Sequence, residues 1–60
     1  MKKRFDYTAK AWMGEYAFSI AGTIEIEKGQ NGYVAARENI MSDGMYDRVE
    51  YVRKANFSKV

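Results

Sequence analysis

The stretch RFDYTAKAWMGEYAFSIAGTIEIE, residues 4–27, decides the fold of this 60-residue chain. Apolar and polar residues alternate in two runs, over residues 3–13 and 16–27. A period of two is typical of a strand with one buried face, because successive side chains point to opposite sides of a sheet. The sequence therefore predicts two neighbouring strands, joined at Gly14 and Glu15 by a two-residue type II′ turn.

This turn sets the register between the two strands. Apolar residues then meet on one face, in the pairs Phe5/Ile24, Tyr7/Gly22, Ala9/Ile20, Ala11/Phe18 and Met13/Tyr16. The other face brings opposite charges together, in the pairs Lys2/Glu27 and Arg4/Glu25. We expect these charges to attract one another across the strands. The missing side chain of Gly22 on the apolar face predicts a bend or a close approach to the backbone.

A helix is predicted after the turn-forming residues 28–32. Asn31 is a favourable N-cap residue and Gly44 suits the left-handed position after a helix end, so we expect the helix over residues 32–43. Its apolar stripe consists of Tyr33, Ala36 and Ile40, flanked by Val34 and Met41. The opposite side carries Ala35, Glu38, Asn39, Ser42 and Asp43. Arg37 is expected to lay its aliphatic stem on the sheet and keep its guanidinium in water.

A third strand is predicted over residues 46–57, where β-branched and aromatic residues return. One side of it carries Val49, Tyr51, Ala55 and Phe57, interrupted by Arg53. The other side carries Tyr46, Arg48, Glu50, Val52, Lys54 and Asn56. A second helix through Met45, Val49 and Val52 is the competing interpretation. The β-branched and aromatic content favours the strand.

Residues 1–60 are therefore predicted to form a single α+β domain with the order strand, strand, helix, strand (ββαβ). A right-handed crossover allows the third strand to pair with the second strand or with the first. We favour a three-stranded antiparallel sheet in the order 2-1-3, because every pairing is then antiparallel. One helix packs on one face of this sheet. Nothing left in the sequence covers the other face.

The composition excludes many functions. The chain has no His and no Cys, and its formal net charge is +2. It therefore offers no thiolate nucleophile, imidazole base or soft-metal site, and we expect no enzyme, no catalytic residue, no cofactor and no metal. Asp43 and Asp47 flank Gly44, but carboxylates beside a helix end are typical of capping and turns. The absence of a signal-peptide core and of a run of about 20 apolar residues predicts a cytoplasmic protein without a membrane partner.

The uncovered sheet face is the main indication of function. It is predicted to carry Lys10, Trp12, Ala17, Ser19, Ala21, Thr23, Tyr46, Arg48, Glu50, Val52 and Lys54. Exposed Trp and Tyr beside Arg are common in binding hot spots. The predicted partner-binding residues are therefore Lys10, Trp12, Tyr46, Arg48 and Lys54. In the alternative interpretation Trp12 only covers the end of the hairpin against Ala17. The free edge of the second strand also leaves a homodimer open.

Basic residues gather at one end of the 2-1-3 sheet. They are Lys2, Lys3, Arg4, Arg53, Lys54 and Lys59. Such a cluster beside exposed aromatic residues suits the phosphates and stacked bases of single-stranded RNA. Two observations argue against RNA binding. Glu25 and Glu27 weaken the positive field, and the motif of aromatic residues and glycines that common RNA-binding sheets carry is absent. The leading hypothesis is thus a protein or nucleoprotein partner, and RNA is the alternative.

The pattern that decides the layout runs through four segments. They are Arg4-Phe5-Asp6-Tyr7, Glu15-Tyr16-Ala17-Phe18, Val34-Ala35-Ala36-Arg37-Glu38 and Val49-Glu50-Tyr51-Val52. In this layout the chain resembles small ββαβ phage host-takeover proteins, such as the T7 phage inhibitor of host RNA polymerase. The resemblance implies a phage accessory protein that binds a host protein or defence complex stoichiometrically in the host cytoplasm. No binding residue is carried over, because residues 28–32 are glycine-rich where that inhibitor has an acidic, glycine-free entry to its helix.

Overall fold

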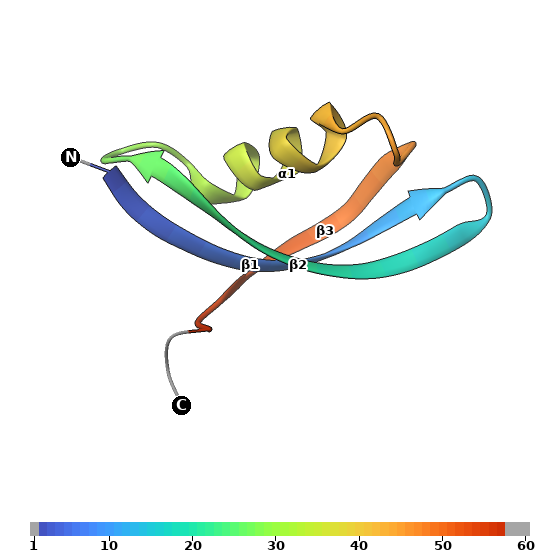
Figure 1. Ribbon diagram of the computed structural model, residues 1–60, viewed down its shortest axis with the longest axis horizontal. Coiled ribbons are helices and arrows are strands. Elements are labelled where there is room, and N and C mark those ends of the chain that lie inside the picture. Colours follow the sequence, from blue (N-terminus) through green and yellow to red (C-terminus); the bar gives the residue numbers. More distant parts are fainter. Residues whose placement is uncertain (1, 58–60) are drawn as a thin grey trace.

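The computed structural model describes residues 2–57 of the chain. Its elements are β1 (Lys2–Met13), β2 (Tyr16–Glu27), α1 (Gly32–Ser42) and β3 (Arg48–Ala55), in that order. The strands form one antiparallel sheet in the order β2-β1-β3, and α1 lies across one of its faces (Figure 1). This confirms the predicted ββαβ α+β fold and the 2-1-3 sheet. The helical alternative for the C-terminal segment is wrong, although β3 is shorter than the predicted strand over residues 46–57.

The β1–β2 hairpin has the predicted register. Every predicted pair is present, from Lys2/Glu27 at the open end to Met13/Tyr16 beside the turn. Gly14 has a φ of +63°, and only glycines have a positive φ within residues 2–57. A positive φ at the first turn residue followed by a negative φ at the second is the combination of a type II′ turn, as predicted.

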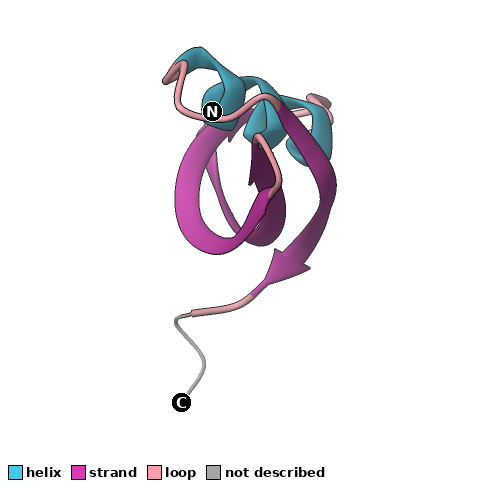
Figure 2. Ribbon diagram, turned by 90° about the vertical axis from the view of Figure 1, so that its right-hand side faces the viewer, coloured by secondary structure: helices cyan, strands magenta, loops and turns pink. Residues whose placement is uncertain are grey.

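The sheet is strongly curved, and α1 lies on its concave side. Figure 2 shows the strands curling beneath the helix when the molecule is viewed from its end. The core between them consists of Phe5, Tyr7, Ala9, Ala11, Ile26, Ala36 and Ile40. The ring of Tyr7 occupies the space beside Gly22, where a Cβ atom would lie 2.7 Å from the Tyr7 hydroxyl oxygen. The close approach predicted at Gly22 is therefore confirmed.

The helix begins and ends at the predicted signals. The Oδ1 atom of Asn31 accepts hydrogen bonds from the backbone N–H groups of Tyr33 at 2.9 Å and Val34 at 3.2 Å. These bonds satisfy two of the free N–H groups of the first turn. At the other end α1 stops at Ser42, one residue earlier than predicted, and Gly44 follows with a φ of +73°.

The buried side of α1 differs in detail from the predicted stripe. Gly32, Ala36 and Ile40 are its buried residues. Ala35, predicted on the polar side, is partly buried against the core. Val34, predicted to flank the stripe, is 52% exposed. Two of the three buried residues, Gly32 and Ala36, are small, which lets the first half of α1 lie close to the strands.

β3 contains a bulge that the sequence pattern did not predict. Tyr51 lies opposite Lys10 of β1, yet Val49 lies opposite Ala11, the next residue of β1. Glu50 is therefore an extra residue without an opposite partner, as in a β-bulge. An extra residue changes which side of the sheet the following side chains face.

The bulge corrects the predicted faces of the C-terminal segment. Val52, predicted on the uncovered face, pairs with a core residue of β1 and is partly buried. Lys54 also pairs with a core-side residue of β1, and Tyr46 packs against the core just before β3. Tyr51 and Arg53, predicted on the core side, pair with residues of the uncovered face instead. The bulge therefore makes the predicted open face wrong for Val52 and Lys54. The prediction is also wrong for Tyr46, which precedes the first residue of β3, Arg48, so that strand alternation does not set its side.

Candidate binding surface

Trp12 lies at the centre of a side-chain cluster on the sheet face that α1 leaves uncovered. Its indole N–H donates a 2.8 Å hydrogen bond to Glu50. The guanidinium carbon of Arg48 lies 4.8 Å from the centroid of the ring and the Lys10 ammonium 5.5 Å from it. Lys10 is also 3.9 Å from the second carboxylate oxygen of Glu50. Cations are attracted to the faces of aromatic rings, so these contacts hold the half-buried indole in one orientation.

Tyr51 and Arg53 extend this cluster along β3. The guanidinium carbon of Arg53 lies 4.6 Å from the centroid of the Tyr51 ring, which is 38% exposed. Sequence reasoning missed Tyr51 and placed Arg53 only among the predicted nucleic-acid-binding residues, because it did not foresee the bulge. Two signals could have revealed it: Arg53 interrupts an apolar side, and Val49 and Val52 are three residues apart where a regular strand would need two or four.

We call the surface formed by these side chains the Trp12 face. It consists of Lys10, Trp12, Arg48, Glu50, Tyr51 and Arg53. Three of the five predicted partner-binding residues, Lys10, Trp12 and Arg48, come together here. Tyr46 lies elsewhere, with its ring edge-on to Phe18 at a centroid distance of 6.1 Å. Lys54, the fifth, belongs to a different part of the surface.

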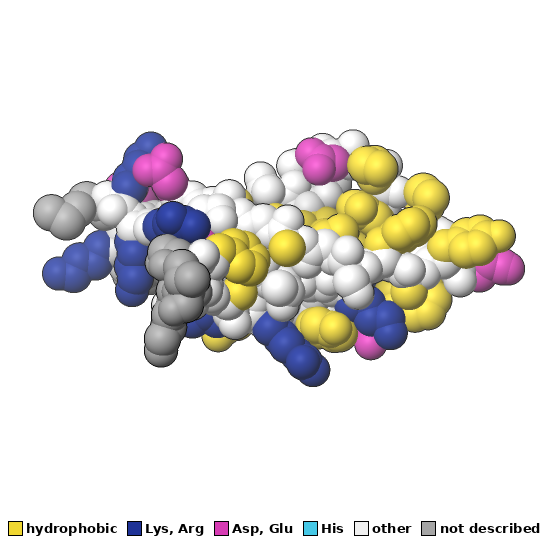
Figure 3. All heavy atoms as spheres, turned by 60° about the horizontal axis from the view of Figure 1, so that its bottom comes forward, with side chains coloured by type: hydrophobic (Ala, Val, Ile, Leu, Met, Phe, Trp, Pro, Cys, Tyr) yellow, Lys and Arg dark blue, Asp and Glu magenta, His cyan; other side chains and the backbone are white. Residues whose placement is uncertain are grey.

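The second feature is a hollow of about 250 Å³ between the N-terminal half of β1 and the end of β3. It is lined by Lys3, Arg4, Asp6, Lys54, Ala55 and Asn56. Three of the predicted nucleic-acid-binding residues, Lys3, Arg4 and Lys54, therefore come together. Figure 3 shows Lys and Arg side chains gathered at one end of the molecule and hydrophobic side chains at the other. Arg53 belongs to the Trp12 face, and Lys59 lies outside the described residues.

Asp6 fixes the guanidinium of Arg4 at this hollow. The carboxylate is only 8% exposed, and its Oδ1 atom accepts hydrogen bonds from Arg4 Nε at 2.7 Å and from the Thr23 hydroxyl at 2.9 Å. Its Oδ2 atom accepts a 3.0 Å bond from the backbone N–H of Phe57. The bond from Arg4 and then the bond from Phe57 hold the pKa of Asp6 below its ordinary value of 3.8.

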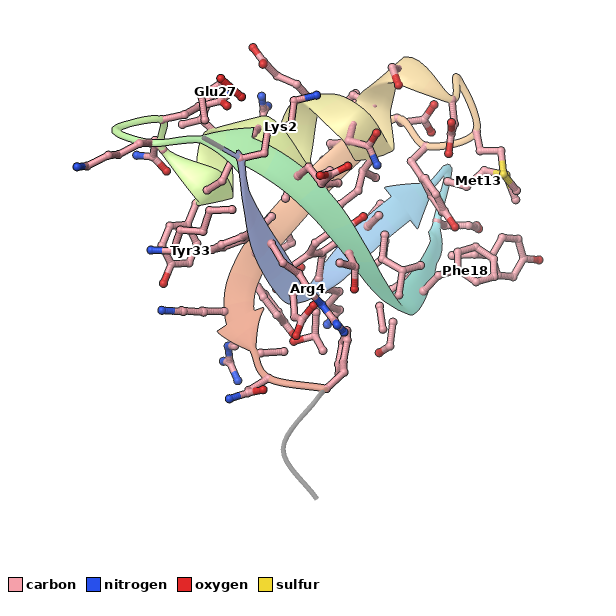
Figure 4. The ribbon with its side chains drawn as sticks, turned by 60° about the vertical axis from the view of Figure 1, so that its left-hand side comes forward. Lys2, Arg4, Met13, Phe18, Glu27 and Tyr33 are labelled. Atoms are coloured by element: carbon pink, nitrogen blue, oxygen red, sulfur yellow. The ribbon has the colours of Figure 1, made fainter. Side chains whose placement is uncertain are left out.

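The predicted cross-strand ion pairs of the hairpin do not form. Within residues 2–57 the ion pairs closer than 4.0 Å are Arg4–Asp6 and Lys10–Glu50. Figure 4 shows Arg4 directed away from the end of the hairpin where Lys2 and Glu27 lie. A buried carboxylate gains far more from a neighbouring cation than an exposed glutamate does. Arg4 therefore pairs with Asp6 and not with Glu25.

The remaining carboxylates near the helix end have structural partners. Asp47 accepts a hydrogen bond from the backbone N–H of Gly14 and so ties the segment before β3 to the hairpin turn. Asp43 is the C-cap of α1. No cluster of three or more potential metal-ligating side chains occurs in the part of the chain from Lys2 to Phe57. In the same part, no helix has the length and apolar character to cross a membrane.

Comparisons with protein-family models, with curated proteins and with solved structures find no match to this chain. Its function is therefore inferred from its own residues.

Proposed function

We propose that this protein binds a partner protein through the Trp12 face and blocks that partner by occupying its surface. No reaction is needed for such inhibition, and one chain occupies one site on the partner. This is the role expected of a small phage accessory protein that acts on a host protein or defence complex in the host cytoplasm. The carrying observation is the fixed position of Trp12 on the uncovered face, between Arg48 and Lys10.

Pre-organisation makes this position suitable for binding. A free indole loses rotamer freedom when it docks, which lowers affinity. Here the hydrogen bond from Trp12 to Glu50 and the two cations already restrict the ring. Trp, Tyr and Arg are also the residue types that carry most binding energy at protein interfaces. The cluster therefore has the composition and the rigidity of a hot spot.

The charge of the Trp12 face indicates the chemistry of the partner. Lys10, Arg48 and Arg53 supply three positive charges, and Glu50 supplies one negative charge. Complementary charges steer two proteins together and disfavour wrong partners. We therefore propose that the partner presents an acidic surface with an apolar recess for the indole.

A Trp12→Ala substitution tests this function. Hot-spot residues typically contribute 2 kcal/mol or more, so affinity for the partner should fall by about 30-fold or more. The fold should persist, because β1 keeps its backbone pairing with both neighbouring strands. The assay compares capture of a partner from a nuclease-treated bacterial lysate by the two proteins, followed by titration calorimetry with the captured partner.

Tyr33→Ala is the matched control. Tyr33 is an exposed aromatic residue on α1, whose ring contacts Phe5 away from the Trp12 face. This variant should retain the captured partner at wild-type affinity. Equal capture by wild-type protein and Trp12→Ala would contradict the proposal, and so would unfolding of Trp12→Ala in circular dichroism, which would assign Trp12 to the core.

A second candidate function is binding of single-stranded nucleic acid, favoured by the cation-lined hollow. Lys3, Arg4 and Lys54 outnumber the single carboxylate of Asp6 there, so a phosphate group would find a net positive site. For this function, affinity for single-stranded RNA should fall steeply with salt, by about 0.7 units of log–log slope per phosphate contacted. A captured partner that disappears after nuclease treatment, with affinity that depends on salt in this way, would favour RNA over the protein partner.

A further inference from the structure

The outer edge of β2 is open. β2 lies at the edge of the sheet, and within the described chain it pairs with β1 alone. It is twelve residues long and contains no Lys, Arg or Pro. Natural edge strands usually carry such residues, or are short, because an open edge offers unpaired N–H and C=O groups to any second strand. The charged residues of β2 are Glu25 and Glu27 at its end, so residues 16–24 have none of these protections.

The concave face of β2 is also only partly covered. α1 packs mainly over β3 and more weakly over β2. As a result Ile20 and Ile24 are only partly buried, and Phe18 is 40% exposed. Figure 4 shows Phe18 and Met13 together at the turn end of the hairpin. Apolar side chains thus follow β2 along its concave side without a complete cover.

We propose that the occupant of this edge is a second copy of the same chain, paired through β2 in an antiparallel arrangement around a two-fold axis. β2 is self-complementary in this arrangement. The even-numbered residues of β2 lie on its concave side. Because side chains alternate along a strand, the concave sides of the two copies form one face only if even-numbered residues lie opposite even-numbered residues. A two-fold axis at Gly22 meets this condition and leaves most of both strands paired. Ile20 then lies opposite Ile24 of the second copy, and Phe18 opposite Ile26 of the second copy.

Charge selects this register over the neighbouring one. With the axis at Gly22, Glu25 falls opposite Ser19 of the second copy and Glu27 falls opposite Ala17 of the second copy. With the axis at Ala21, Glu27 would approach Glu15 in the hairpin turn of the second copy, and like charges close together destabilise a sheet. With the axis at Thr23, residues 16–18 would lie beyond the end of the second copy's β2 and would lose their pairing. The axis at Gly22 is therefore the favoured one.

The dimer would be a six-stranded antiparallel sheet with both helices on one side. The half-covered isoleucines of β2 would gain apolar neighbours from the second copy. Both Trp12 faces would stay free, because they lie on the opposite side of the sheet. Self-association is thus independent of the proposed partner binding, and each can fail without the other.

The test introduces a positive charge at Ala21 in one variant and a negative charge in another. This residue is exposed on the uncovered face, and its opposite residue in β1 is the uncharged Thr8, so a charge there is compatible with the folded chain. Across the axis, Ala21 and Ala21 of the second copy are diagonal neighbours about 7–8 Å apart. Ala21→Lys and Ala21→Glu should each weaken dimerisation by about 10-fold, measured by sedimentation over a concentration series. A 1:1 mixture of the two variants should restore dimers, because opposite charges then meet.

Asn39→Lys on the exposed side of α1 is the control, and it should dimerise like wild-type protein. Circular dichroism of each variant verifies the fold. The proposal is overturned by a wild-type mass of 6.9 kDa at every concentration up to about 1 mM. It is also overturned if Ala21→Lys and Ala21→Glu each dimerise as strongly as wild-type protein, since self-association would then use another surface. A 1:1 mixture of the two variants that stays monomeric would overturn it as well.

Discussion

At the scale of single residues, Asp6 shows how one buried charge reorganises its neighbours. Alternation places it on the polar side of β1, and nothing in the sequence indicates that it is buried. The C-terminal segment brings the N–H of Phe57 onto its carboxylate, and the carboxylate draws Arg4 away from Glu25. The sequence pattern could predict that Arg4 and Glu25 are register partners, but the competition for Arg4 is a tertiary effect.

The lowered pKa of Asp6 predicts a specific loss of stability in acid. The folded state stabilises the ionised carboxylate of Asp6 more than the unfolded state does. This contribution to stability is therefore complete at pH values above the ordinary pKa of 3.8. It is lost as the pH falls through the lower pKa of the folded state. Urea unfolding at pH 7 and at several values below 4 measures this loss.

Asp6→Asn should be less stable at pH 7, because an amide brings N–H groups where Arg4 and Phe57 already donate. Its stability should also fall less steeply below pH 4. Asp43→Asn, a carboxylate with no hydrogen bond or ion pair to residues 2–57, is the control and should keep the wild-type slope. Identical acid profiles for wild-type protein and Asp6→Asn would show that Asp6 carries no such linkage.

At the scale of elements, local sequence signals predicted most of the fold. Gly14 fixes the hairpin turn and therefore the register of two strands, while Asn31 and Gly44 mark the ends of the helix. The bulge at Glu50 was not predicted, because its two signals in the sequence, the interruption at Arg53 and the three-residue spacing of Val49 and Val52, resemble a weakly alternating strand. That missed bulge explains why Tyr51 and Arg53 were absent from the predicted partner-binding residues.

The contact between α1 and β1 makes a prediction that opposes helix propensity. Replacing glycine by alanine in a helix normally stabilises it. At Gly32, however, a Cβ atom would lie 2.5–2.8 Å from ring atoms of the buried Phe5. Gly32→Ala should therefore destabilise the fold by about 1–3 kcal/mol, the usual cost of overpacking. The change is measured as the free energy of unfolding in urea.

Asn39→Ala is the control for that substitution, because its side chain is exposed on α1. It should change the free energy of unfolding by less than about 0.5 kcal/mol. A stabilising Gly32→Ala would mean that Phe5 can move aside, and the close packing of α1 on β1 would then be wrong.

At the scale of the whole molecule, the fold places the core, the Trp12 face and the cation-lined hollow in different regions. α1 and the concave side of the sheet form the core, and the convex side carries the Trp12 face. The cation-lined hollow lies between the N-terminal half of β1 and the end of β3. Composition predicted surface recognition rather than catalysis, because a chain without His or Cys lacks an imidazole base and a thiolate nucleophile, and this stays a prediction. The set of residues on that surface required the structure, since the curvature and the bulge decide it.

The most direct measurement of the central claim is site-specific photo-crosslinking in a nuclease-treated bacterial lysate. A benzophenone amino acid replaces Tyr51 on the Trp12 face in one protein and the exposed Val34 on α1 in the other. The account predicts a crosslinked protein partner from position 51 and none from position 34. A partner captured only from position 34, or no partner from position 51, would contradict it.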